Sequence, residues 1–166
     1  MKKLTYKSGN LLLAKDVVAI GHQANCQNTF GSGIARTIRE MYPNAYAADT
    51  AAFKTGNAKL GEISVGAISS EPNGPSSIRR IYNLYGQNLY GRGPRQTNYD
   101  ALYSALEAMV KHLRESTVTD VPVGFPYKMG SDRGGGSWDV VSRLIEVAFD
   151  DYDGDVIIYR LDQPVP

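Results

Sequence analysis

Apolar and polar positions along the chain alternate in blocks that predict strands and helices in turn. The run VVAI at residues 17–20 is typical of a strand buried on both faces, and we expect this strand to end at Gly21 and His22. Residues 121–125 and 155–161 predict further strands. Residues 98–116 carry apolar side chains at helical spacing, which predicts the clearest helix. This alternation indicates a layered α/β fold with a largely parallel sheet.

Weaker patterns complete the expected architecture. Leu4 and Tyr6 suggest a first strand, and residues 45–53 suggest a short helix. Residues 60–68 and 78–84 predict two strands joined by a turn, either as a hairpin or as neighbours of mixed orientation. The expected sheet is therefore mixed.

Two glycine-rich loops stand at predicted junctions between a strand and a helix. Gly31, Ser32 and Gly33 open a helix on which Ile34 and Ile38 recur at helical spacing. The first amides of a helix lack partners and carry the positive end of its dipole, so a phosphate suits this position. We call residues 31–33 the first glycine loop.

The second loop lies near the C-terminus. Residues 130–137, the second glycine loop, bring Gly134, Gly135 and Gly136 to the start of another predicted helix, with Ser137 as the expected N-cap. Parallel strands end at the same edge of a sheet, so both loops are expected there. Two cradles at one edge suit a diphosphate better than a monophosphate.

Composition narrows the class of protein. At 166 residues with 42% hydrophobic content, the chain predicts a single domain over residues 1–166, and we expect a monomer. Its 18 basic and 17 acidic residues argue against a large nucleic-acid footprint and favour a small-molecule partner. One cysteine and two histidines disfavour a zinc site, so we expect neither metal nor cofactor. The N-terminus lacks a signal-peptide core and no run reaches transmembrane length, which predicts a cytoplasmic protein without a membrane partner.

The order of these motifs resembles the macrodomain pattern over essentially the whole chain. The pattern comprises GNL at residues 9–11, Ala24 with Asn25, the first glycine loop, PYKMG at residues 126–130 and the final GGGSW. HQANCQNTFGSGIA, at residues 22–35, is similar to the stand-alone ADP-ribose-1″-phosphate phosphatases. NLYGQ, RQTNYDAL and PYKMGSDRGGGSW are similar to a bacterial and phage branch that processes ADP-ribose.

The resemblance implies a three-layer α/β/α fold with a central mixed, largely parallel sheet and ADP-ribose across the carboxyl ends of its strands. Where macrodomains commonly have an aspartate that accepts from the adenine amino group, this chain has Asn10, which predicts weaker adenine selectivity. The ligand-binding residues that the resemblance implies are Gly9, Asn10, Leu11, Ala24, Asn25, Phe30, Gly31, Ser32, Gly33, Ile34, Gly130, Ser131, Asp132, Arg133, Gly134, Gly135, Gly136 and Ser137.

Three of the polar residues are candidate catalytic groups. His22 is either a buried structural histidine or a group that moves a proton near the distal ribose. Asn25 either caps a loop or contacts that ribose, and Asp132 is either a general base or a charge on the rim. Residues 84–88 contain no lysine, which argues against the covalent route of macrodomains that use a lysine nucleophile.

These features predict an ADP-ribose-1″-phosphate phosphatase that works without a metal and releases ADP-ribose and phosphate. A module that binds ADP-ribose without turnover is the first alternative. The second is a hydrolase without a lysine intermediate that acts on O-acetyl-ADP-ribose or on ADP-ribosylated protein or nucleic acid, so ADP-ribosylated macromolecules are further candidate partners. Macrodomains host all three activities, so the fold does not separate them.

Overall fold

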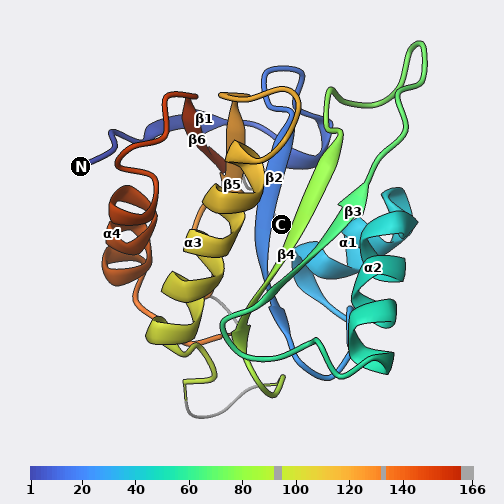
Figure 1. Cartoon of the computed structure of the whole chain (residues 1–166), viewed down its shortest axis with the longest axis vertical. Helices are drawn as coiled ribbons and strands as arrows, with labels where there is room; N and C mark the ends of the chain where they lie inside the picture. The colour runs from blue at the N-terminus through green and yellow to red at the C-terminus, as the bar shows by residue number, and fades with distance from the viewer. Residues whose placement is uncertain (92–94, 132–133, 162–166) are drawn as a thin grey trace, which may run out of the picture.

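A computed structural model describes residues 1–91, 95–131 and 134–161, which form one mixed sheet between two helical layers (Figure 1). The strands lie in the order β1-β6-β5-β2-β4-β3, with β3 antiparallel to its neighbour and the others parallel. In chain order the elements are β1 (Thr5–Ser8), the 3₁₀ turn η1 (Leu11–Leu13), β2 (Ala19–Asn25), α1 (Gly33–Met41), α2 (Pro43–Lys54), β3 (Ile63–Ala67), β4 (Arg80–Gln87), α3 (Tyr99–Arg114), β5 (Val123–Pro126), α4 (Trp138–Ala148) and β6 (Val156–Arg160).

Each helical layer buries its own apolar cluster against one face of the sheet. Leu102 and Leu106 of α3 and Ile145 of α4 belong to the cluster on one face. Ile38 of α1 and Ala45 of α2 belong to the cluster on the other. Figure 1 shows α3 and α4 together on one side of the sheet and α1 and α2 on the other. The three-layer α/β/α architecture with a mixed, largely parallel sheet is therefore confirmed.

The other element predictions are largely confirmed. The two strands expected around residues 60–84 are β3 and β4, which pair antiparallel. Helix α3 begins as predicted, because Asn98 caps it by accepting a hydrogen bond from the amide of Ala101 at 3.0 Å. Within the described residues, none of the helices is both long enough and apolar enough to span a membrane.

Strand β2 is longer than the sequence pattern predicts. It does not end at Gly21 and His22 but continues to Asn25, because β4 pairs with it along its whole length. The polar residues at its end are buried against neighbouring elements, so they do not mark a strand terminus. The expected boundary was wrong by three to four residues.

The far half of β2 has a neighbour on one side only. Pairing with β5 stops at Ile20, while pairing with β4 continues through a bulge after Ala24 to Asn25. The chain leaves β2 toward α1 on one face and leaves β5 toward α4 on the other. Such a reversal is a topological switch point, where open α/β sheets bind their ligands.

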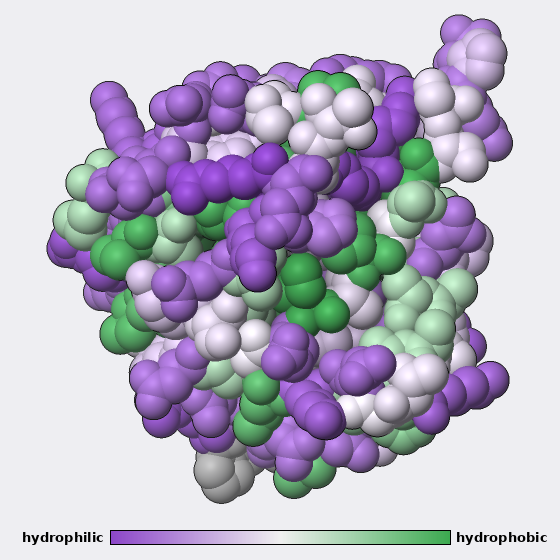
Figure 2. All heavy atoms as spheres, viewed as in Figure 1, coloured by the Kyte–Doolittle hydropathy of each residue, from purple (hydrophilic) through white to green (hydrophobic). Residues whose placement is uncertain are grey.

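The face of the molecule in Figure 2 is mostly polar. Apolar residues appear on it in separate groups between polar ones, which is usual for a protein surface.

Candidate functional site

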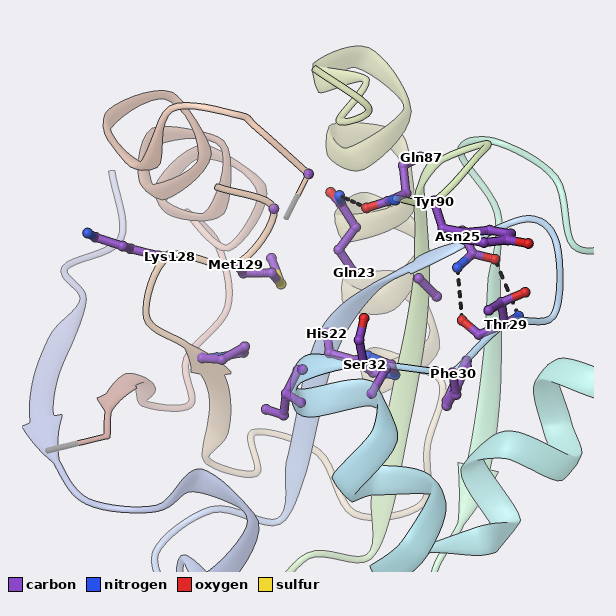
Figure 3. Close-up of a pocket in the computed structure, with 18 of the residues that line it drawn as sticks. His22, Gln23, Asn25, Thr29, Phe30, Ser32, Gln87, Tyr90, Lys128 and Met129 are labelled. Carbon is purple, nitrogen blue, oxygen red and sulfur yellow. Dashed lines mark hydrogen bonds between the residues drawn. The ribbon is translucent and has the colours of Figure 1, made fainter. Parts of the chain in front are cut away.

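A cavity of about 500 Å³ lies at the switch point (Figure 3). Its size falls within the range of ~300–1,000 Å³ that is usual for small-molecule sites. The end of β2, the loop into α1, the end of β4 and the loop after β5 form its walls. The lining residues are His22, Gln23, Ala24, Asn25, Thr29, Phe30, Gly31, Ser32, Gly33, Ile34, Ala35, Gln87, Tyr90, Gly91, Pro126, Tyr127, Lys128, Met129, Gly130 and Gly134.

The first glycine loop lines this cavity at the start of α1. Ser32 occupies the N-cap position but makes no side-chain capping bond, so the first amides of the helix remain available. Gly33 has a φ of +60°, and a Cβ placed on it would have no atom within 4 Å. The loop therefore presents free donors to open space, as predicted for an anion cradle.

The charge of the lining suits an anion. Among the lining residues that the structure describes, none is acidic, and Lys128 is the basic one, although its side chain is directed away from the other labelled residues in Figure 3. A cavity with positive helix-end amides and no carboxylate on its described wall favours phosphate-bearing ligands.

His22 lies within the strand and is fully buried. Its Nε2 is 2.7 Å from Oδ1 of Asn83, and its ring packs edge-on against Phe30 with 5.3 Å between centroids. Its Nδ1 is buried with no hydrogen-bond partner in the described part of the chain. Burial holds the pKa of His22 below its usual range, although Asn83 and the charge of Asp49 act in the opposite direction.

His22 therefore combines both roles considered from the sequence. It is buried and hydrogen-bonded, as expected of a structural histidine, and it also lines the cavity. A neutral imidazole with one unpaired nitrogen is a potential proton acceptor, which is the feature a catalytic role requires.

The side chain of Asn25 closes the loop that leads to α1. Its Oδ1 accepts a hydrogen bond from the amide of Gln27 at 2.9 Å, and its Nδ2 donates to the carbonyl of Thr29 at 2.9 Å. The loop-capping alternative is thus present in the structure, and the ribose contact of Asn25 stays a prediction. Asp132 and Arg133 lie outside the described residues.

The second glycine loop differs from the expected open cradle. Gly130 and Gly134 line the cavity, but Gly135, Gly136 and Ser137 are not among its lining residues. The amide of Gly136 donates to the carbonyl of Gly130 at 2.9 Å. The amide of Ser137, at the start of α4, donates to the hydroxyl of Tyr99 at 2.8 Å. This hydroxyl from α3, a helix that begins far from Ser137 in sequence, occupies one amide of the loop that we expected to surround a diphosphate.

A polar cluster that sequence reasoning missed supports the second glycine loop. Nε2 of Gln23 donates to Oε1 of Gln87 at 2.7 Å and to Oγ1 of Thr97 at 2.8 Å (Figure 3 shows the former). Thr97 in turn donates to the carbonyl of Gly130 at 2.6 Å. The signal available in the sequence was a glutamine between His22 and Asn25 on a buried strand, where a polar side chain needs partners.

Other predicted binding residues are not among those that line the cavity. Gly9, Asn10 and Leu11 follow β1 and are not among the lining residues. Oδ1 of Asn10 accepts from the amide of Leu12 at 3.0 Å. Ser131 is also outside the lining, and its amide donates to the carbonyl of Lys128 at 2.9 Å. The ligand contacts of these residues stay predictions.

The remaining candidate chemistry is limited. Cys26 is buried, and burial raises the pKa of its thiol, which fits packing better than nucleophilic chemistry. Residues 1–91, 95–131 and 134–161 contain no group of three histidine, cysteine or acidic side chains arranged to hold a metal ion.

The chain is similar in sequence to proteins that are named for reactions of ADP-ribose derivatives. The chain is 29% identical to the DNA ADP-ribosyl glycohydrolase of Mycobacterium tuberculosis over 157 residues, which is 94% of this chain and 42% of that protein. The chain thus spans less than half the length of this relative. It is also 42% identical over 45 residues to the ADP-ribose 1″-phosphate phosphatase of Aspergillus fumigatus, a match that covers 27% of the chain and 22% of that enzyme.

Structural comparison agrees with the sequence matches. The macrodomain of Mycobacterium tuberculosis DarG superposes with a TM-score of 0.74 at 26% identity, over 96% of this chain and 98% of that structure. The family model described as Macro domain matches residues 22–145 of this chain. The sheet order, the cavity at the switch point and these matches together show that the chain belongs to the Macro domain family.

Proposed function

We propose that this chain binds ADP-ribose in the cavity and hydrolyses a substituent at the anomeric position of its distal ribose, with ADP-ribose 1″-phosphate as the substrate. The observation that carries the proposal is His22, a residue that lines the cavity, whose Nδ1 has no partner among the described residues and whose lowered pKa favours the neutral imidazole. The relatives named for hydrolysis of ADP-ribose derivatives support the same class of reaction.

The binding step uses the first glycine loop. The amides at the start of α1 would hold the diphosphate, because they are unpartnered and carry the positive end of the helix dipole. Asn25 would shape this loop through its bonds to Gln27 and Thr29, so its loss would weaken binding and turnover together.

The chemical step uses His22 as a proton acceptor. A water attacks phosphorus, the bond between phosphorus and O1″ breaks, and ADP-ribose and inorganic phosphate are released. Nδ1 of His22 would take a proton from the attacking water and return it to O1″, so no net proton remains on the enzyme. Asp132 remains a second proposed general base.

ADP-ribosylated nucleic acid is the second candidate substrate. The match to a DNA ADP-ribosyl glycohydrolase covers 94% of the chain, whereas the match to the phosphatase covers 27%. In that reaction, water attacks C1″ in place of phosphorus, the bond from C1″ to the nucleic acid breaks, and the proton that His22 takes from the water passes to the leaving group. The same acceptor at His22 would serve either reaction.

The test is a parallel assay of purified protein with ADP-ribose 1″-phosphate and with ADP-ribosylated DNA. We expect phosphate release from the first substrate. His22→Gln keeps a donor toward Asn83 but removes the base, so turnover should fall by about 100-fold or more while ADP-ribose affinity stays within a few-fold.

His112→Gln is the matched control, because His112 lies on α3, outside the cavity lining. This variant should keep the wild-type turnover. Wild-type turnover in His22→Gln would remove His22 from the mechanism. Tight ADP-ribose binding without turnover of either substrate would favour a binding module.

A further inference from the structure

A chain of buried hydrogen bonds runs from His22 on β2 to Asp49 on α2. Nε2 of His22 is 2.7 Å from Oδ1 of Asn83, and Nδ2 of Asn83 donates to Oγ of Ser64 at 2.9 Å. Ser64 is 2.7 Å from the hydroxyl of Tyr85, which donates to Oδ1 of Asp49 at 2.6 Å. His22, Asn83 and Asp49 are fully buried, so the bonds at the two ends of this series, from His22 to Asn83 and from Tyr85 to Asp49, are shielded from water.

The orientation of Asn83 is fixed by a backbone carbonyl. Its Nδ2 also donates to the carbonyl oxygen of Ala45 on α2 at 2.9 Å. A carbonyl oxygen only accepts, so a flipped Asn83 amide would place two acceptors against each other. Oδ1 must therefore face His22, and Nε2 of His22 must carry the proton that it donates to Oδ1.

The hydrogen bonds at the Asp49 end of the series agree with this direction of donation. Burial and the hydrogen bond to Asp49 raise the pKa of Tyr85, so its hydroxyl keeps the proton that it donates to the carboxylate. Ser64 accepts from Asn83, which leaves its own proton for the oxygen of Tyr85. Every hydrogen bond in the series is then donated in the direction of Asp49, and bonds aligned in this way strengthen one another.

We infer that Asn83 is a positioning residue that holds His22, which lines the cavity, as the neutral Nε2–H tautomer, so that Nδ1 is the nitrogen left to accept from an O–H group of the ligand or of a water bound beside it. An N–H at Nδ1 would find no acceptor among the described residues, because that nitrogen is buried and unpaired. The identity of the O–H group, a hydroxyl of the distal ribose or a water bound beside it, rests on the proposed function. The tautomer does not.

The tautomer is measured by long-range ¹H–¹⁵N correlation NMR of the histidine rings. The chain has two histidines, so His112 provides an internal reference and His112→Gln assigns the spectrum. Wild-type protein should show a protonated Nε2 and a bare Nδ1 for His22. A wild-type spectrum with the proton on Nδ1 would overturn the inference without any variant or substrate.

Two variants then test the role of Asn83. Asn83→Leu removes the acceptor at similar volume, so the His22 ring should lose its single tautomer. Ser64→Ala is the matched control, because Asn83 keeps its bond to the carbonyl of Ala45 and the wild-type tautomer should persist. An unchanged tautomer in folded Asn83→Leu would show that another group orients His22 and would overturn the assignment.

Ligand titrations test what Nδ1 accepts. ADP-ribose should shift the Nδ1 resonance of His22, whereas ADP, which lacks the distal ribose, should leave it within error of the free protein. Calorimetry shows separately whether ADP-ribose binds. If it binds but shifts the Nδ1 resonance no more than ADP does, the claim that Nδ1 accepts from an O–H group at the distal ribose is wrong, and the proposed binding stands. If ADP-ribose does not bind, the proposed function and the claim about what Nδ1 accepts both fail. The tautomer measurement still decides the role of Asn83.

Discussion

The two glycine loops share a sequence signature but reach different structural states. The first stands in open space at the start of α1, where a Cβ on Gly33 would touch nothing within 4 Å. The second is packed, because a Cβ on Gly134 would lie 2.4 Å from Oγ1 of Thr97 and 2.8 Å from the carbonyl oxygen of Gly130. The open space at Gly33 is available to a ligand, whereas the missing side chain of Gly134 allows close packing against Thr97 and the backbone of Gly130.

The residues beneath the loops differ in the same way. His22, whose ring packs against Phe30 beside the first loop, keeps one ring nitrogen unpaired. Gln23 uses both hydrogens of its Nε2 to hold Gln87 and Thr97 beneath the second loop, although its Oε1 has no partner among the described residues. Both residues line the cavity, and Gln23 in addition ties the second loop to β4.

The largest expected effect is the loss of stability in Gly134→Ala. The added methyl group meets a backbone oxygen that cannot move cheaply, so the free energy of unfolding should fall by about 1–3 kcal/mol. Urea denaturation measures it. Gly31→Ala is the control from the first loop, since its Cβ would make an ordinary 3.6 Å contact with Thr29. Equal urea midpoints in Gly134→Ala and Gly31→Ala would contradict the difference in packing between the two loops.

The next effect is on ligand affinity. Gly33→Ala should weaken ADP-ribose binding by about tenfold, or ~1.4 kcal/mol, because a side chain at this point obstructs the approach to the amides of α1. Gly56→Ala is the matched control, because Gly56 also has a positive φ, of +74°, and open space around it, but lies outside the cavity lining.

Calorimetry on this pair separates backbone strain from ligand contact. Both variants should lose similar stability, since both force a side chain into the left-handed region. Comparable ADP-ribose affinity in the two variants would count against the first glycine loop as the binding cradle.

A smaller effect is expected in the pH dependence of stability. The pKa of His22 is below its usual value of 6.5 in the folded protein, so below that pH the unfolded chain binds more protons. Wild-type stability should therefore be fully present above pH 6.5 and fall as the pH drops through that value. In acid denaturation curves, the slope of the unfolding free energy against pH gives the number of protons taken up on unfolding, and His22→Gln should lower this number by up to one. An identical slope in both proteins would mean that the folded state protonates His22 normally.

The smallest effect concerns the start of α4. Tyr99→Phe removes the hydroxyl that accepts from the amide of Ser137, at a cost of about 0.5–1.5 kcal/mol. The pKa of Tyr99 reports on this hydrogen bond. The amide of Ser137, as the largest cause, and Arg95 both lower the pKa of the Tyr99 phenol. Ultraviolet titration of tyrosines in the wild type and in Tyr99→Phe should reveal one phenol with a lowered pKa that is absent from the variant. A gain of ADP-ribose affinity in Tyr99→Phe would show that the second helix start can act as a cradle.

The parts of the molecule that the sequence predicted depend on local pattern. Apolar spacing located α3, and the buried runs located β2 and β5. The first glycine loop was predictable for the same reason, since its glycines and the helix they open are adjacent in sequence.

The parts that were missed depend on contacts between distant residues. Pairing with β4 extends β2 to Asn25, and the hydroxyl of Tyr99 occupies the amide of Ser137 across 38 positions. The carbonyl that orients Asn83 comes from Ala45 on another element. No local pattern encodes such partners, so the state of each polar group at the site had to come from the structure.

The most direct test of the account is a crystal structure of the protein with ADP-ribose. We expect the diphosphate on the amides of the first glycine loop and the distal ribose, or a water beside it, within hydrogen-bond distance of Nδ1 of His22. The amide of Ser137 should still donate to Tyr99. ADP-ribose with its diphosphate at the start of α4, or bound outside the cavity at the switch point, would contradict the account.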